Sequence, residues 1–527
     1  MWRYDGRVSA LRRWVVVAAV AGSGACGSGD SGNSATATAW TAGVFQPAST
    51  FAAQCATPRV GTDPTTGKAY PDKAGSVLTQ NNWLRSWTHD LYLWYREVPD
   101  VNPASSATAD YFSVLKTTAT TPSGNPKDKF HFTYSTDQWV ALSQSGVEAG
   151  YGAQWVVVAS RPPRQVVVAY TEPGSPATAA SANLARGAQV LTVDGVDLVN
   201  ATDSASINTL NAGLFPSAPG GSHSFSILDL GAATPRTVTM VAASVTSTPV
   251  QNVETIGTRA GNVGYMLFND HIATAEQQLV SAFSQLQGAG VSDLVLDIRY
   301  NGGGYLDIAS EVAYMIAGPG PTGGQGFEKT VFNDKYPSMN PVTGEGLAPV
   351  PFHATSQGFS GPKDQPLPTL SLPRVFVLSS PNTCSASEAI MNGLRGVGVQ
   401  VIQIGTTTCG KPYGFYPADN CGTTYFSIQF QGVNAQGFGD YPDGFSPANT
   451  ASSPGVALPG CSVGDDFGHA LGDRDEGRLA AALAYRLDQG CPAAAAASRN
   501  PEMVRGASAT DGLAPKSPWR ENRILRR

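Results

Sequence analysis

The second half of the chain alternates short apolar runs, typical of buried strands, with amphipathic stretches typical of helices. Strands are predicted at 262–268, 293–298, 374–378 and 400–404, and helices at 274–287, 307–316, 385–395 and 479–485. Strands that alternate with helices favour a largely parallel sheet with helices on its faces. The pattern predicts an α/β domain over 250–491, with an irregular insertion rich in glycine and proline at 318–370.

The segment from Arg374 to Phe415 concentrates residues that could carry chemistry. A predicted strand leads through a Ser-Pro-Asn-Thr turn into a helix that begins near Ser385. Backbone N–H groups at a helix N-terminus have no helical partner, so they can stabilise a negative oxygen there. The spacing of Ser385 and Glu388 also fits an ordinary capping box, which is the purely structural interpretation.

Three motifs of the chain, which occur in the same order as in the family, resemble those of the C-terminal processing (tail-specific) serine peptidases. They are Ser385-Ala386-Ser387-Glu388, then Gly410-Lys411, and upstream the stretch 296–304 (LDIRYNGGG), which is similar to the family's D-(L/I)-R-x-N-x-G-G motif. The resemblance covers about 75–490 and implies an α/β (α+β multidomain) fold with a crotonase-like ββα core. It implies Ser385 as nucleophile and Lys411 as general base. It also implies an oxyanion hole from Ala386 and the glycine backbone at Gly302 and Gly303.

A Ser-Lys dyad needs no cofactor and no metal. Serine is a weak nucleophile until a base takes its proton. Lysine, with a solution pKa near ~10.4, serves as that base only when burial disfavours its ammonium form. The stretch around Lys411 (TTCGKPYGFY) carries no other charge and several aromatic residues, which fits such an environment.

Several positions leave alternatives open. Many family members have glutamine four residues after the lysine, where this chain has Phe415, so the third catalytic partner is undefined. Assembly of the dyad as in the family would bring Cys384 and Cys409 together as a bridge, and Cys409–Cys421 is the rival pairing. His271 is a second candidate base, similar to the histidine of tricorn-type peptidases. Structural roles are expected for Ser387, for His89, for Asp297 with Arg299, and for the turn residues Asp440 and Asp443.

Residues 140–247 resemble a bacterial PDZ domain. A Gly-Ser-Pro-Ala turn at 174–177 follows two β-rich runs, and a strand ending at Asp194-Gly195 comes later. Upstream, Gly150-Tyr151-Gly152-Ala153 resembles the carboxylate-binding loop of PDZ domains, whose backbone N–H groups can face one anion. A plain hairpin loop is the structural alternative.

A small helical module is predicted before it, over 75–135. In the stretch 82–98, Trp83, Trp87, Leu91 and Trp94 recur at the spacing of one helix face. A second short helix is expected at 110–116.

The N-terminus has the pattern of an export signal. Four arginines precede the short apolar run 14–21, and Gly-Ser-Gly-Ala-Cys ends at Cys26, which resembles a bacterial lipobox except for Ser23. We therefore expect a signal peptide at 1–26 with Cys26 lipidated, a flexible tether and N-terminal segment at 27–74, and a mobile tail at 492–527. The protein would lie on the periplasmic face of the outer membrane, or in the periplasm if Cys26 is unmodified.

The expected function is cleavage of polypeptides by an exported serine endopeptidase. Six cysteines besides Cys26 fit disulfides in an oxidising compartment. A net charge of −6 makes nucleic acid an unfavourable partner, and no Cys/His cluster has metal-site spacing. Two rivals remain: a non-catalytic protein that binds peptides or hydrophobic ligands on the same scaffold, and an acyl-CoA enzyme, which export disfavours.

Overall fold

The computed structural model describes residues 40–63, 66–492 and 523–524. The predicted signal peptide with Cys26, part of the tether and most of the tail lie outside these residues. Among the described helices, none is both long and apolar enough to cross a membrane.

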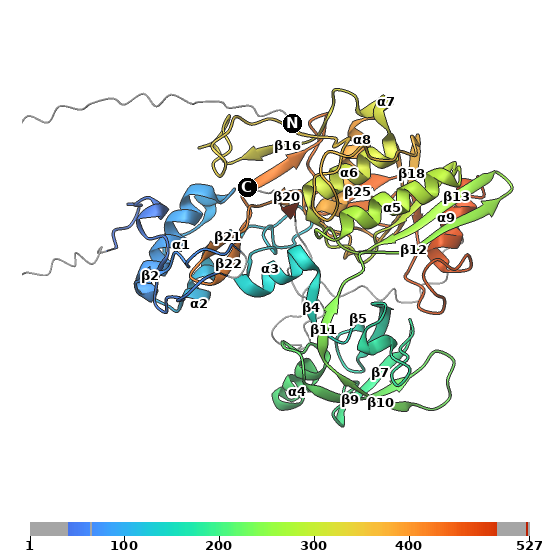
Figure 1. Cartoon of the computed structure of the whole chain (residues 1–527), viewed down its shortest axis with the longest axis horizontal. Coiled ribbons are helices and arrows are strands. Elements are labelled where there is room, and N and C mark those ends of the chain that lie inside the picture. The colour runs from blue at the N-terminus through green and yellow to red at the C-terminus, as the bar shows by residue number, and fades with distance from the viewer. Residues whose placement is uncertain (1–39, 64–65, 493–522, 525–527) are drawn as a thin grey trace, which may run out of the picture. The chain divides into compact units, whose positions relative to one another are not determined.

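A six-stranded sheet forms the centre of the 250–491 region (Figure 1). Its strands, in spatial order, are β12 (Val250–Thr258), β13 (Gly261–Phe268), β14 (Asp293–Asp297), β18 (Arg374–Ser379), β19 (Gln400–Gly405) and β26 (Gly460–Ser462). Strands β13 to β26 run parallel, and β12 is antiparallel to β13. The predicted parallel sheet is confirmed.

Helices cover both faces of this sheet. They are α5 (Ala275–Gly288), α6 (Leu306–Ala317), α8 (Ala386–Gly396) and α9 (Gly477–Arg486). In β14, Leu294 and Leu296 pack into the core shared with α5, α6 and α8, whereas Val295 packs with Leu479 of α9 on the other face. Because side chains alternate along a strand, one short apolar run serves two cores.

The 140–247 region has its own antiparallel sheet and its own core. Its elements are β4 (Val147–Gly150), β5 (Ala153–Ala159), β6 (Gln165–Thr171), η3 (Pro176–Thr178), β7 (Gln189–Val193), β8 (Val196–Asp197), α4 (Ser204–Leu214), β9 (Ser222–Leu228), β10 (Arg236–Val241) and β11 (Ala243–Thr246). Val156 and Val167 of this sheet share a cluster with Tyr265 and Phe376 of the central sheet. The two regions are therefore packed against each other.

The N-terminal module contains η1 (Ala48–Thr50), β1 (Gln54–Cys55), β2 (Lys73–Ala74), α1 (Val77–Leu91), η2 (Tyr95–Glu97) and α2 (Thr108–Val114), followed by β3 (Phe132–Ser135) and α3 (Thr136–Ser145). The prediction that Trp94 continues the first helix was wrong. Tyr92 is extended, its hydroxyl donates to Asp128, and the next backbone N–H, of Leu93, donates to Ile428 O. These distant partners draw the chain out of the helix after Leu91.

The remaining described elements lie outside the six-stranded sheet. They are β15 (Gly304–Tyr305), α7 (Pro319–Thr322), β16 (Gly326–Phe332), β17 (Val350–Pro351), β20 (Tyr413–Gly414), β21 (Ala418–Asn420), β22 (Thr423–Phe426), β23 (Phe430–Val433), β24 (Phe445–Pro447), β25 (Val456–Leu458) and β27 (Arg523–Ile524). The insertion at 318–370 is more regular than predicted, because β16 pairs with β23 from about a hundred residues later.

Candidate active site

Four loops that follow neighbouring parallel strands meet at one edge of the central sheet. His271 follows β13, the glycine-rich stretch 301–304 follows β14, Ser385 follows β18, and Lys411 follows β19. The carboxyl ends of parallel strands lie at the same edge, where ligands of such sheets usually bind. The structure thus brings the predicted nucleophile, base and oxyanion loop to one place.

Ser385 has an unusual backbone conformation. Its φ is 61° and its ψ is −112°, and its side chain is fully buried. A non-glycine residue in this region costs on the order of 1–3 kcal/mol, and such strain gathers at functional sites. Neighbouring bonds hold the turn in place: Cys384 N–H donates to Asn301 O at 3.1 Å, and the Thr383 hydroxyl donates to Ile298 O at 2.9 Å.

Glu388 connects the two predicted dyad residues. Its Oε2 accepts the backbone N–H of Ser385 at 3.0 Å and that of Lys411 at 2.8 Å. Its Oε1 accepts Gly410 N–H at 2.9 Å and the Thr408 hydroxyl. One buried carboxylate therefore holds the backbone of both predicted catalytic residues, a role that the capping-box spacing alone did not reveal.

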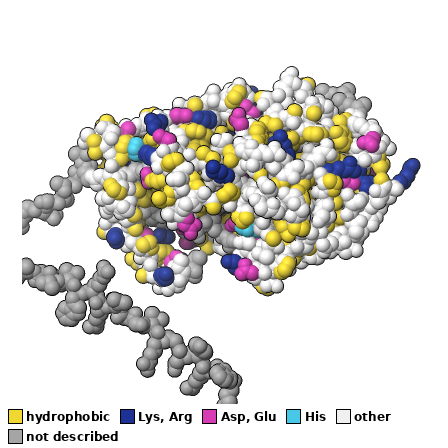
Figure 2. Space-filling view, turned by 90° about the horizontal axis from the view of Figure 1, so that it is seen from above, with side chains coloured by type: hydrophobic (Ala, Val, Ile, Leu, Met, Phe, Trp, Pro, Cys, Tyr) yellow, Lys and Arg dark blue, Asp and Glu magenta, His cyan; other side chains and the backbone are white. Residues whose placement is uncertain are grey.

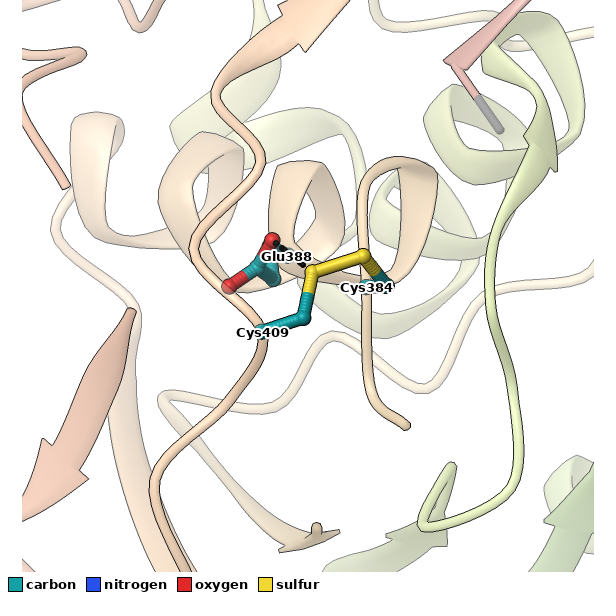
Figure 3. Close-up of side chains that lie close together, drawn as sticks. All are labelled: Cys384, Glu388 and Cys409. Carbon is teal, nitrogen blue, oxygen red and sulfur yellow. Dashed lines mark hydrogen bonds between the residues drawn. A yellow bond between two sulfur atoms is a disulfide. The ribbon is translucent and has the colours of Figure 1, made fainter. Parts of the chain in front are cut away.

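A disulfide reinforces the same contact. Cys384 and Cys409 are bonded, with a Cα–Cα distance of 5.2 Å, and Glu388 lies beside the bridge (Figure 3). This is the pairing implied by the family resemblance, and the rival Cys409–Cys421 pairing is wrong. Donor atoms of the two cysteines and Glu388 lie within 4.8 Å of one another. Because the sulfurs are bonded to each other, they are not thiolate ligands for a metal.

Lys411 is fully buried between aromatic rings. Its Nζ lies 4.6 Å from the ring centroid of Phe130 and 4.7 Å from that of Phe415. Phe130 comes from the N-terminal module, and the neighbouring Lys129 Nζ donates to Cys409 O at 2.8 Å. The module therefore forms a wall of the site, which no local sequence signal around Phe130 indicated.

The glycine loop is held by Asn301. Its Oδ1 accepts the N–H of Gly303 at 2.9 Å, and its backbone oxygen accepts the Ser387 hydroxyl at 3.0 Å. The structural role predicted for Ser387 is thus observed. The Gly303 N–H, a predicted oxyanion donor, is bonded to Asn301 in this conformation. Gly304 has a φ of 141°, and a Cβ there would lie 2.4 Å from His271 O, so the loop requires glycine at this position.

His271 is fully buried, and burial lowers its pKa to about 3. Its Nδ1 lies 2.9 Å from Asn301 Oδ1. Because an amide oxygen only accepts, Nδ1 carries the proton of the neutral ring and Nε2 carries the lone pair. Nε2 has no hydrogen-bond partner among the described residues.

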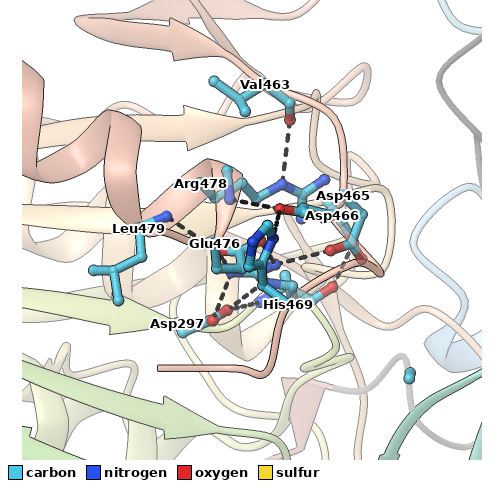
Figure 4. Close-up of polar contacts among 12 residues, drawn as sticks. Asp297, Val463, Asp465, Asp466, His469, Glu476, Arg478 and Leu479 are labelled. Carbon is cyan, nitrogen blue, oxygen red and sulfur yellow. Dashed lines mark hydrogen bonds and ion pairs between the residues drawn. The ribbon is translucent and has the colours of Figure 1, made fainter. Parts of the chain in front are cut away.

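Arg299 is the centre of a buried ion cluster, and its three acidic partners, Asp297, Asp465 and Glu476, are labelled in Figure 4. It pairs with Asp297 at 2.9 Å, with Glu476 at 2.6 Å and with Asp465 at 2.8 Å. The predicted structural pairing of Asp297 and Arg299 is observed, and it is part of a larger network. Arg186 of the 140–247 region joins this network through an ion pair with Asp465 at 2.6 Å. It also donates to the hydroxyl of Tyr300, which precedes Asn301, at 2.6 Å.

The predicted peptide-binding loop lines a cavity of about 820 Å³. Gly150, Tyr151, Gly152 and Ala153 all contribute to its wall, together with residues of α3, α4 and β11. The lining includes Glu148 and Glu172 but no lysine, arginine or histidine. A carboxylate bound here would therefore depend on backbone N–H groups.

The outer surface mixes charges of both signs among uncharged side chains, without a broad basic patch on the face seen in Figure 2.

Comparisons with known proteins fit this geometry. Residues 262–414 match peptidase family S41. A carboxyl-terminal-processing protease of Picosynechococcus is 27% identical over 277 residues, which is 51% of this chain. The chain spans 56% of that relative's length. The region around the candidate site is therefore similar to peptidase family S41 and to that protease.

A solved structure shows a similar fold. The crystal structure described as an S41 protease of Bacteroides fragilis superimposes with a TM-score of 0.56 at 22% identity. The match covers 80% of this chain and 98% of that one. The similarity therefore extends well beyond the segment 262–414.

Proposed function

We propose that the chain is an exported serine endopeptidase that cleaves polypeptides through a Ser385–Lys411 dyad. The observation that carries the proposal is the single carboxylate of Glu388, which bonds to the backbone of both residues at 3.0 Å and 2.8 Å. Nucleophile and base must be held together before proton transfer can occur, and this arrangement does so without substrate.

The reaction proceeds in two halves. Neutral Lys411 takes the proton of the Ser385 hydroxyl, and Oγ bonds to the substrate carbonyl carbon. The oxyanion accepts hydrogen bonds from Ala386 N–H and from the glycine loop at Gly302 and Gly303, the latter after Gly303 N–H leaves Asn301. The C–N bond then breaks and Lys411 returns the proton to the leaving amine. Water, deprotonated by Lys411, hydrolyses the ester and restores Ser385.

Lys411 is a better candidate base than His271. A base is most effective when its pKa is near the working pH. With a pKa of about 3, His271 is a weak proton acceptor at neutral pH. Its bond to Asn301 instead gives it a role in holding the oxyanion loop. Phe415, in place of the family's glutamine, packs against the Lys411 amine and supplies no hydrogen bond from its side chain.

Hydrolysis of an unstructured protein such as casein tests this mechanism. The protein lacking residues 1–26 is compared with Ser385→Ala and Lys411→Ala, and each variant should lose at least ~10³-fold in kcat/KM. Ser387→Ala is the matched control on the same turn and should retain most activity, since Ser387 only supports Asn301. Unchanged cleavage in Lys411→Ala would reject the dyad and make His271 the next candidate base. A folded parent without activity would favour a non-catalytic peptide-binding protein.

We further propose that the cavity at Gly150–Ala153 captures extended peptide segments of the substrate. Ala212 lines this cavity from α4, so Ala212→Trp should raise KM for long substrates and leave hydrolysis of short peptides unchanged. Ala205→Trp, on an exposed position of the same helix, is the control. Equal effects of both variants would argue against capture at this cavity.

Export and lipidation at Cys26 form part of the proposal. Labelled palmitate should be incorporated into the full chain and not into Cys26→Ser. Absence of label in the parent, with export intact, would indicate an ordinary signal peptide and a periplasmic protein.

A further inference from the structure

Strand β15 begins directly after the predicted oxyanion loop, and its two edges have different partners. On one edge, His271 N–H donates to Gly303 O at 3.1 Å and Tyr305 N–H donates to His271 O at 2.9 Å. Backbone groups of successive strand residues point in opposite directions. The N–H and C=O of Gly304 therefore face the other edge.

The other edge pairs with a segment from the far end of the sequence. Strand β27 runs parallel to β15, with Arg523 opposite Gly304 and Ile524 opposite Tyr305. β27 also contacts β20, the short strand that begins two residues after Lys411. The backbone at 523–524 thus lies between the strand that follows the oxyanion loop and the strand that follows the base.

A substrate peptide must lie in this space. The scissile carbonyl has to reach the nucleophile while its oxygen faces the oxyanion donors. An extended peptide gains affinity by adding a strand to a sheet edge, and the edge of β15 that β27 occupies is at the right position. A pairing of two residues is marginally stable by itself, so an occupant of this edge can exchange with another peptide.

We propose that the Gly304–Tyr305 edge is the docking site for the substrate backbone, and that the two-residue segment Arg523–Ile524 is its resident competitor. This inference rests on the proposed peptidase function. The segment occupies the edge as an extended strand parallel to β15, and substrates bind by displacing it. The competition raises the apparent KM of the full chain and leaves kcat unchanged.

Two changes to the protein test the competition. A chain ending at Pro492 keeps the Cys461–Cys491 bridge and lacks the competitor. Ile524→Pro keeps the segment and removes an N–H at a paired position. Both should lower KM for a short fluorogenic peptide by about 3- to 10-fold, given a pairing of only two residues, with kcat within about twofold. Ile524→Val preserves a good strand residue and should behave as the parent. Unchanged KM in both altered proteins would overturn the proposal.

A binding measurement separates this inference from the peptidase proposal. A labelled peptide of residues 517–527 is titrated into the Pro492-terminated chain carrying Ser385→Ala, beside the same peptide with proline at position 524 and one with scrambled order. Saturable binding of the native peptide alone supports docking even if no substrate is ever cleaved. Equal binding of all three, or none, overturns docking even if Ser385 and Lys411 prove catalytic.

Discussion

Glu388 Oε2 accepts the backbone N–H groups of both Ser385 and Lys411, so one carboxylate oxygen sets the position of nucleophile and base together. Glu388→Gln should lower kcat by about 10- to 100-fold, because the amide nitrogen cannot accept a hydrogen bond. In one orientation of the amide the N–H groups of Ser385 and Lys411 lose their acceptor, and in the other orientation the N–H of Gly410 loses it. KM should change little. Glu345→Gln, at an exposed position, is the control for loss of a carboxylate. Full activity of Glu388→Gln would show that the Cys384–Cys409 disulfide and the surrounding loops align Ser385 and Lys411 without the Glu388 carboxylate.

The Cys384–Cys409 bridge should support alignment more than stability. Its loop of 25 residues contributes roughly 3 kcal/mol by chain entropy, and the Cys461–Cys491 bridge, with a separation of 30, contributes about the same. Double alanine variants of either pair should therefore unfold at similarly lowered temperatures. Only the Cys384/Cys409 variant should also have a lower kcat, when kcat is measured at a temperature at which both variants are folded. Equal kcat in the two variants would contradict an aligning role.

The buried pair Glu276 and Glu311 predicts a pH dependence of stability. Burial, followed by the charge of Glu276, raises the pKa of Glu311 to about 9. Glu276 lies beside Glu311 and accepts four backbone N–H groups from the 357–361 loop, which hold its carboxylate in this position. The folded chain thus keeps a proton on Glu311 that the unfolded chain releases above the ordinary glutamate pKa of 4.5.

Stability from this pair is complete below about pH 4.5 and falls as the pH rises toward 9, by up to ~1.4 kcal/mol per pH unit. Glu311→Gln should remove that part of the slope, as measured by denaturant unfolding between about pH 5 and 9. Glu345→Gln should keep the parent's slope. Parallel curves for parent and Glu311→Gln would show that Glu311 is ionised in the folded protein.

Arg299 should be essential for folding and remote from the chemistry. Arg299→Met leaves Asp297, Asp465 and Glu476 buried without their shared cation, at a cost of about 3–5 kcal/mol. Arg474→Met, at an exposed position, should cost less than about 0.5 kcal/mol. Chemical denaturation measures both, and a small loss for Arg299→Met would mean that the three carboxylates find other partners.

The sequence indicated the parts of the site that depend on local pattern. Apolar periodicity located the central strands, and the turn before Ser385 placed that residue at a helix start. Contacts across long separations were not accessible in this way. Glu388 accepts a hydrogen bond from the backbone N–H of Lys411, 23 positions later in the sequence. The ring of Phe130, from the N-terminal module, packs against the Lys411 amine, and β16 pairs with β23. Trp94 fits a helical pattern and still leaves the helix, because Tyr92 and Leu93 bond to distant residues.

The Cys55–Cys421 bridge encloses most of the described chain, including the 140–247 region and Ser385. One backbone cut anywhere between these cysteines leaves two fragments that remain covalently joined, and the same holds between Cys461 and Cys491. A self-nicked protein would migrate as an intact chain in a denaturing gel without reductant. Only cuts between 421 and 461, or outside the two outer bridges, release a fragment, so searches for self-cleavage of this chain need reduced samples.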